Sequence, residues 1–121
     1  MGYEFSKVSA VNLERSNIWH PDGLESWSYS DWACAMAGEA GEVCNAIKKL
    51  NRYRDGMRQK RLVSARDADI RHQLIADVAM ELGDTFLYLD LLAQRLGLNI
   101  EECIVKTFNR VSVREGFIQR L

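Results

Sequence analysis

Hydrophobic residues recur at helical spacing along most of the chain, and the alternation typical of strands is scarce. The apolar positions predict four helices, over about residues 6–19, 31–56, 68–96 and 100–111. A turn signal, His20-Pro21-Asp22-Gly23, ends the first of them. The sequence therefore predicts an all-α fold that forms a four-helix bundle.

Several residues that favour helix ends accompany these boundaries. Ser30 or Asp31 can cap the second helix, and Asn99 can cap the fourth. Gly97 is placed to close the third helix as a C-terminal cap. Residues 57–67 are polar and basic, and we expect them to form the loop between the second and third helices.

The third helix carries a predicted core stripe, which consists of Ile75, Val78, Leu82, Leu89, Ala93 and Leu96. On both long helices, further apolar residues lie outside a single stripe. One bundle of 121 residues would struggle to cover all of this apolar surface, which favours a homo-oligomer.

Composition narrows the class of protein. A chain of 121 residues fits a single domain over residues 1–121, and a net charge of -1 gives no argument for a nucleic-acid or membrane partner. No apolar run approaches the roughly 20 residues that a membrane span needs, and the N-terminal residues lack the apolar segment of a secretory signal. Cys34 and Cys44, about 15 Å apart on one predicted helix, are too distant for a disulfide. We expect a cytoplasmic protein.

Two pairs of carboxylates stand out from the helical pattern. Glu39 and Glu42 lie three residues apart on the second predicted helix, and Glu81 and Asp84 lie three apart on the third. Residues at this spacing share a helix face, so each pair places two negative charges side by side. The residues four positions further on, Val43, Ala46, Thr85 and Tyr88, supply no compensating cation.

A solvated acidic face is the simplest explanation of such charges. Small residues around them, including Gly38, Gly41 and Gly83, instead favour the close approach of a ligand or of another backbone. Clustered carboxylate oxygens suit Mg²⁺ or Mn²⁺, and the other positions around such an ion are commonly filled by water and substrate phosphate. A di-iron bundle would need Glu-x-x-His motifs, which His20 and His72 do not supply.

Candidate substrate contacts lie near these motifs and in both terminal parts of the chain. Lys49 follows Glu42 by about two helical turns, together with Lys48 and Arg52, and a cation there could offset phosphate charge. On the fourth helix, Lys106 could hold a phosphate and Asn109 could read a base edge, and the two side chains share a face.

Near the first turn, a base could stack on the rings of Trp19 and Trp27. Tyr88, one turn beyond the second carboxylate pair, is a further candidate.

The two carboxylate motifs resemble those of the MazG-like family. That family belongs to the all-α nucleoside triphosphate pyrophosphohydrolases, along with dimeric dUTPases, dCTP pyrophosphatases and phosphoribosyl-ATP pyrophosphohydrolases. Residues 32–43 look like its first motif, residues 81–89 like its second, and residues 106–110 like its C-terminal motif.

The resemblance implies an oligomeric helical enzyme, a homodimer or homotetramer, that uses Mg²⁺ to cleave a nucleoside triphosphate to the monophosphate and pyrophosphate. It implies that Glu39, Glu42, Glu81 and Asp84 are the metal ligands and carry catalysis. It also matches Lys106 and Asn109 to nucleotide-contacting positions, and it places Trp19 and Trp27 roughly where relatives have base-contacting aromatics. The expected role is the removal of noncanonical or surplus nucleotides.

Two other classes of function stay open at this point. A non-catalytic helical interaction module could retain a metal-binding face without turnover. A nucleic-acid binder could use the segment from Lys48 to Arg66, which holds eight of the 16 cations, although the net charge of -1 makes this the weakest interpretation.

Overall fold

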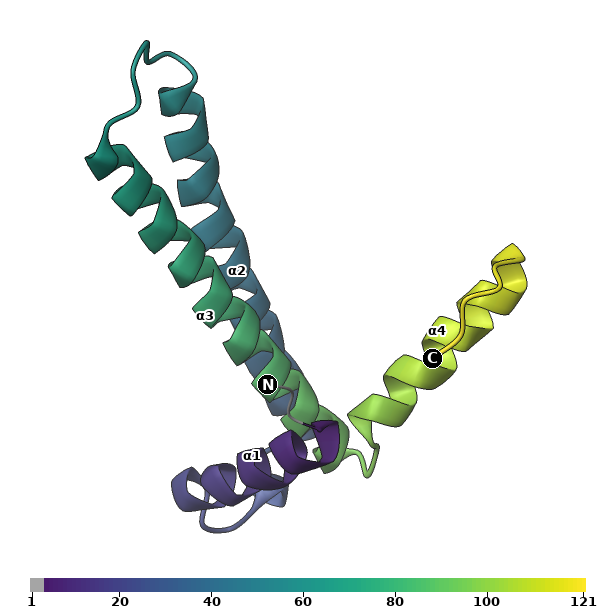
Figure 1. The fold of residues 1–121 in the computed structure, drawn as a ribbon. Coiled ribbons are helices and arrows are strands. Elements are labelled where there is room, and N and C mark those ends of the chain that lie inside the picture. Colours follow the sequence, from purple (N-terminus) through teal and green to yellow (C-terminus); the bar gives the residue numbers. More distant parts are fainter. Residues whose placement is uncertain (1–3) are drawn as a thin grey trace. The chain divides into compact units, whose positions relative to one another are not determined.

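The computed structural model describes residues 4–121, and these residues are helical apart from the connections between helices and the tail after Glu115 (Figure 1). The elements, in chain order, are α1 (Phe5–Trp19), the 3-10 helix η1 (Leu24–Ser26), α2 (Tyr29–Met57), α3 (Ala65–Arg95) and α4 (Ile100–Glu115). Within residues 4–121 there are four α-helices and no strand, so the predicted all-α class is confirmed.

Both long helices begin earlier than the sequence analysis predicts. Ser28, rather than Ser30 or Asp31, caps α2: its Oγ accepts a hydrogen bond from the backbone N–H of Asp31 at 3.1 Å, and its own N–H donates to the Asp31 carboxylate at 2.9 Å. This reciprocal pair is a capping box, in which two unpaired helix-end donors are satisfied. The bond from the Ser28 backbone also lowers the pKa of Asp31.

The same device starts α3. Ser64 accepts a hydrogen bond from the backbone N–H of Asp67 at 3.2 Å and donates its own N–H to the Asp67 carboxylate at 2.9 Å. The helix therefore begins at Ala65 instead of the predicted Ala68, and the connecting loop shrinks to residues 58–64. Both predicted starts are wrong because a Ser-x-x-Asp capping box, which hydrophobic periodicity does not contain, sets the first residue of each helix.

The caps predicted at Asn99 and Gly97 are confirmed, but α4 continues to Glu115, beyond its predicted end near residue 111. The side chain of Asn99 caps α4 by accepting a hydrogen bond from the N–H of Glu102 at 3.1 Å. Gly97 adopts a positive φ of 70° just beyond α3, a conformation that glycine reaches without the steric penalty of a Cβ atom. Leu98 then donates its N–H to the carbonyl of Ala93 at 2.8 Å, which closes the helix.

The described chain divides into two compact units. One contains the chain up to Trp32 together with Leu89–Leu121, and the other is Ala33–Tyr88. The predicted single domain over residues 1–121 stays a prediction. The second unit is an antiparallel pair made of most of α2 and α3, whose far ends are joined by the loop at residues 58–64 (Figure 1).

In the first unit, a buried polar network joins α1 to the end of α3. Asp90 is only 1% exposed, and its carboxylate accepts hydrogen bonds from Ser9 at 2.5 Å, Asn12 at 2.9 Å and Gln94 at 2.9 Å. Trp32 is fully buried in the same unit and donates its indole N–H to the carbonyl of Leu24 at 2.8 Å. A buried charge persists only where such donors satisfy it.

The predicted core stripe of α3 is only partly buried. Ala93 is 7% exposed, but Ile75 is 38% exposed and Leu82 is 55% exposed. Helical periodicity identifies an apolar face, whereas burial depends on what lies against that face, and one chain leaves much of it uncovered. Leu89 and Leu96 are exposed as well. None of the described helices combines the length and the apolar character that crossing a membrane requires.

Candidate metal centre

Three of the four predicted carboxylate ligands meet on the α2–α3 pair. Glu39 on α2 and Glu81 and Asp84 on α3 each offer a carboxylate oxygen, and these oxygens all lie within 4.8 Å of one another. The side chains of Glu39 and Glu81 are half-buried, whereas Asp84 is exposed. Glu81 and Asp84 share a face through their spacing of three residues, so the pairing of the two helices brings Glu39 to them.

The cluster is electrostatically unfavourable as it stands. Burial, and then the charges of Asp84, Glu81 and Glu42, raise the pKa of Glu39. None of the ion pairs found among residues 4–121 involves these four carboxylates. A network built for stability would place a lysine or arginine among the acids, so the arrangement calls for a cation from solution.

A divalent cation fits this donor set. Mg²⁺ and Mn²⁺ prefer hard oxygen ligands, and oxygens about 2.1 Å from one Mg²⁺ lie at most about 4.2 Å apart. The observed limit of 4.8 Å lies close to that value, so small side-chain rotations bring all three oxygens into range. The carboxylates Glu39, Glu81 and Asp84 are therefore the residues that would hold the ion.

Glu42 lies beside this cluster rather than in it. It lines a groove of about 230 Å³ between α2 and α3, together with Asn45, Lys49, Asp77 and Glu81. Asp77 accepts a hydrogen bond from Gln73 at 2.9 Å within α3. Asn45 was missed by the sequence analysis, although its positions three residues after Glu42 and four before Lys49 place it on their face.

Comparison with known proteins bears on this site. A family model for the MazG nucleotide pyrophosphohydrolase domain matches residues 28–116. The chain belongs to the MazG family. It is also similar to the Gene 37 protein of Mycobacterium phage L5, at 30% identity over 100 residues that cover 81% of this chain and 75% of that protein. No solved structure matches the chain significantly.

The MazG match includes both carboxylate pairs, Tyr88 and the two polar candidates on α4. Those α4 side chains have partners within their own unit. Lys106 forms an ion pair with Glu102 at 3.4 Å, and Asn109 exchanges two hydrogen bonds with the backbone of Leu121, at 2.8 and 3.3 Å. For Asn109 to contact a nucleotide, its side-chain amide must first lose these hydrogen bonds to Leu121.

The tryptophans predicted to stack on a base lie just outside the MazG match. Trp19 ends α1, is 66% exposed, and has the guanidinium of Arg15 over its ring at 5.2 Å. Trp27 is half-buried, and its ring centroid lies 4.6 Å from those of both His20 and Trp32. Trp19 therefore presents an accessible ring, whereas Trp27 belongs to an aromatic cluster.

The glycines beside the acidic motifs make no close packing contact among residues 4–121. A Cβ atom built on Gly38, Gly41 or Gly83 would meet no atom within 4 Å. The close approach that these small residues allow therefore has no partner among the described residues, and the space beside the carboxylates is open to a ligand or to another molecule.

Proposed function

We propose that this MazG-family protein is a nucleoside triphosphate pyrophosphohydrolase that uses Mg²⁺, or Mn²⁺ in its place, to produce the monophosphate and pyrophosphate. The convergence of Glu39, Glu81 and Asp84 carries the proposal, because three unpaired carboxylates from two helices form a donor set for such an ion. A bound divalent ion lowers the pKa of water and neutralises phosphate charge.

The groove beside the cluster supplies the remaining groups. Lys49 and Asn45 line this groove. In the proposal, Lys49 offsets the charge of the phosphate chain and Asn45 donates a hydrogen bond to a phosphate oxygen. Glu42 completes the acidic set on the groove side, where a carboxylate can orient the attacking water. The further residues proposed to contact the nucleotide, each taken by itself, are Lys106, Asn109, Tyr88, Trp19 and Trp27.

A homodimer or homotetramer is part of the proposal. Met80 is 70% exposed and Leu82 is 55% exposed on α3, and Ile47 is 38% exposed on α2. Apolar side chains at this density along a helix pair favour burial against a second copy. The proposed setting is the cytoplasm, where the three free cysteines would stay reduced, and the proposed role is the removal of unwanted nucleotides.

A nucleotide panel tests the activity. The full chain is incubated with each common ribo- and deoxyribonucleoside triphosphate, in Mg²⁺ and in EDTA, and the products are separated. We expect monophosphate and pyrophosphate from a subset of nucleotides, only in Mg²⁺. Asp84→Asn and Glu42→Gln should each abolish this turnover and keep the helical fold, while Glu14→Gln on α1 should retain it.

The same nucleotide panel distinguishes an enzyme from a non-catalytic protein. Stabilisation by Mg²⁺ without turnover of any nucleotide would identify a non-catalytic metal-binding module. Pyrophosphate release that persists in EDTA, or in Asp84→Asn, would refute the assignment of the site.

A further inference from the structure

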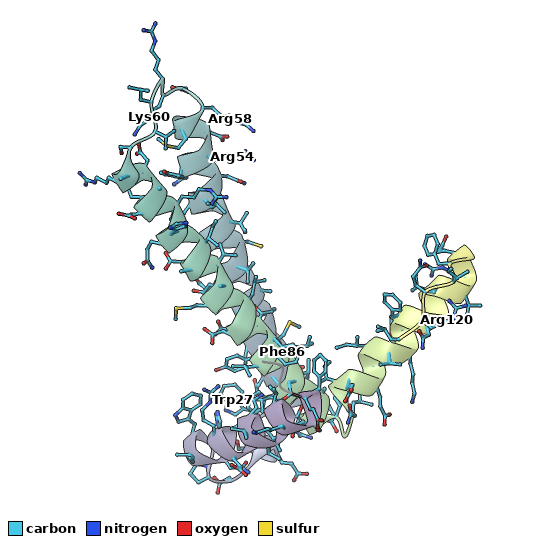
Figure 2. All side chains as sticks on the ribbon, in the orientation of Figure 1. Trp27, Arg54, Arg58, Lys60, Phe86 and Arg120 are labelled. Atoms are coloured by element: carbon cyan, nitrogen blue, oxygen red, sulfur yellow. The ribbon has the colours of Figure 1, made fainter. Side chains whose placement is uncertain are left out.

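A second groove lies nearer the loop end of the α2–α3 pair, and none of Glu39, Glu81 and Asp84 lines it. Its volume is about 280 Å³, and three arginines line it: Arg54 on α2, Arg58 directly after α2, and Arg71 on α3. Leu50, Tyr53 and Met57 supply apolar surface between them. Figure 2 shows Arg54 near the end of α2 and Arg58 where the loop at residues 58–64 begins.

The cations of this groove have only one exposed carboxylate among their ion-pair partners within residues 4–121. Arg54 contacts Asp55 at 3.0 Å, and Arg58 reaches the same carboxylate at 3.9 Å. Arg71 has no ion-pair partner within residues 4–121. Because exposed pairs of this kind contribute little to stability, a stronger anion can take these guanidinium groups from Asp55.

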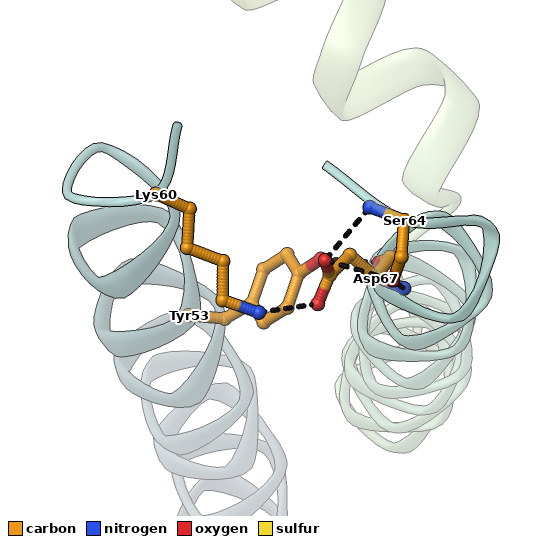
Figure 3. A network of polar contacts seen from close by, with 4 residues as sticks. All are labelled: Tyr53, Lys60, Ser64 and Asp67. Carbon is orange, nitrogen blue, oxygen red and sulfur yellow. Dashed lines mark hydrogen bonds and ion pairs between the residues drawn. The ribbon is translucent and has the colours of Figure 1, made fainter. Parts of the chain in front are cut away.

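A separate network holds the groove in shape. Asp67, at the start of α3, is bound by Ser64 and by Lys60 of the loop (Figure 3). The ion pair between Lys60 and Asp67 has a distance of 2.8 Å. The hydroxyl of Tyr53 donates to the backbone carbonyl of Asp67, which joins α2 to α3. The ring of Tyr53 is therefore fixed by contacts that do not use the arginines, and a ligand would meet a preformed surface.

We propose that this groove binds a phosphate monoester that carries a planar or apolar group, such as a nucleoside monophosphate. Guanidinium groups recognise phosphate through paired hydrogen bonds, and the apolar surface accepts a ring. The volume lies near the lower end of the range for small-molecule sites, which suits a ligand of this size. This inference goes beyond the proposed hydrolysis and does not depend on it.

Calorimetric titration of the full chain tests the proposal. AMP, ribose 5-phosphate and inorganic phosphate are titrated separately in EDTA, so that binding supported by a divalent ion is absent. We expect AMP to bind most tightly and inorganic phosphate most weakly. Equal affinity for all three would refute the contribution of the apolar surface, and the absence of binding by any of them would refute the site.

Matched double variants locate the binding. Arg58→Gln with Arg71→Gln should weaken AMP binding by at least about tenfold, since charge-assisted hydrogen bonds are lost. Arg61→Gln with Arg66→Gln removes the same charge near the same loop but from residues outside the groove, and should change affinity less than about twofold. Equal losses in both doubles would show diffuse attraction to a basic segment and overturn the proposal.

Two further readouts separate this site from the acidic groove. Lys49→Gln should leave AMP binding in EDTA unchanged, and a loss confined to that variant would place the ligand in the acidic groove instead. The double variant of Arg58 and Arg71 should keep the Mg²⁺-dependent turnover of the wild-type chain. If binding and turnover failed together in that variant, the arginines would belong to the substrate site and the separate site would be refuted.

Discussion

Replacing Glu39 by glutamine should stabilise the metal-free protein and remove its response to divalent ions. Glutamine keeps the size of the side chain and removes one of the charges that lie within 4.8 Å of one another. At that separation, two unit charges repel by about 1 kcal/mol in water and by about 3.5 kcal/mol at an effective dielectric constant of 20. Because Asp84 is exposed, the repulsion in water, about 1 kcal/mol, applies to each of the two pairs that Glu39 forms, with Glu81 and with Asp84.

The expected gain is therefore about 1–2 kcal/mol, or a rise in Tm of about 4–8 °C for a chain of this size. The gain should depend on pH. Because the pKa of Glu39 is raised in the folded protein, this residue destabilises the fold as pH rises through and above its ordinary value of 4.5. In acid, where Glu39 is protonated, the wild-type chain and the variant should have the same stability.

Thermal melts followed by circular dichroism check the reasoning, in EDTA and in MgCl₂ or MnCl₂ at equal ionic strength. Wild-type protein should gain about 2.7 kcal/mol when the ion is present at 100 times its Kd, and the variant should gain much less. Glu14→Gln, the same change on α1, controls for the loss of one negative charge. If Glu39→Gln melts below the wild type in EDTA at neutral pH while Glu14→Gln is unchanged, the repulsion argument is wrong.

Three further changes probe the fold. Bonds to Lys60 and Ser64 lower the pKa of Asp67 to about 2, so its carboxylate should stabilise the protein above the ordinary pKa of 3.8 and lose that effect as pH falls toward 2. In urea titrations, the free energy of unfolding of Asp67→Asn should therefore fall less steeply over this pH range than that of the wild type. An equally steep fall in both proteins would contradict this prediction. Asp90→Ala should lower the free energy of unfolding by about 3–5 kcal/mol, because three side-chain donors lose a buried acceptor. A loss of less than about 1 kcal/mol in denaturant titrations would show that the polar network around Asp90 does not stabilise the fold. Gly56→Ala should raise stability by about 0.5 kcal/mol in the same titrations, because its Cβ would meet no atom within 4 Å, and a decrease would show an unseen contact.

The fold class could be predicted because apolar spacing of 3.6 residues persists over each long helix. The helix starts at Ser28 and Ser64 were missed because a capping box is a local hydrogen-bond pattern that hydrophobic periodicity does not contain. Burial was also misjudged: Leu82 belongs to an apolar face, but the residues that cover such a face are decided by tertiary or quaternary packing, on which periodicity is silent.

The candidate site was predictable in part for the same reason. Spacing of three residues shows that Glu81 and Asp84 are neighbours, since it is a property of one helix. Which acid of α2 meets them depends on the rotation and register of α2 against α3, and the packed structure places Glu39 there and Glu42 in the adjoining groove. The contact between Asn109 and Leu121 depends likewise on a tail conformation that carries no periodic signal.

The contrast between two carboxylates of the α2–α3 pair gives the strongest argument that the acidic cluster is functional. Asp67 has a complete set of partners, and its pKa is lowered to about 2 by Lys60 and Ser64, as expected of a group that stabilises the fold. Glu39 is half-buried among three other acids, and its pKa is raised. The same helix pair thus neutralises one carboxylate at its loop end and leaves another uncompensated, although α2 carries cations only a few turns away at Lys48 and Lys49. A fold selected for stability alone has no use for that uncompensated charge, whereas a site that must bind and release a cation requires it.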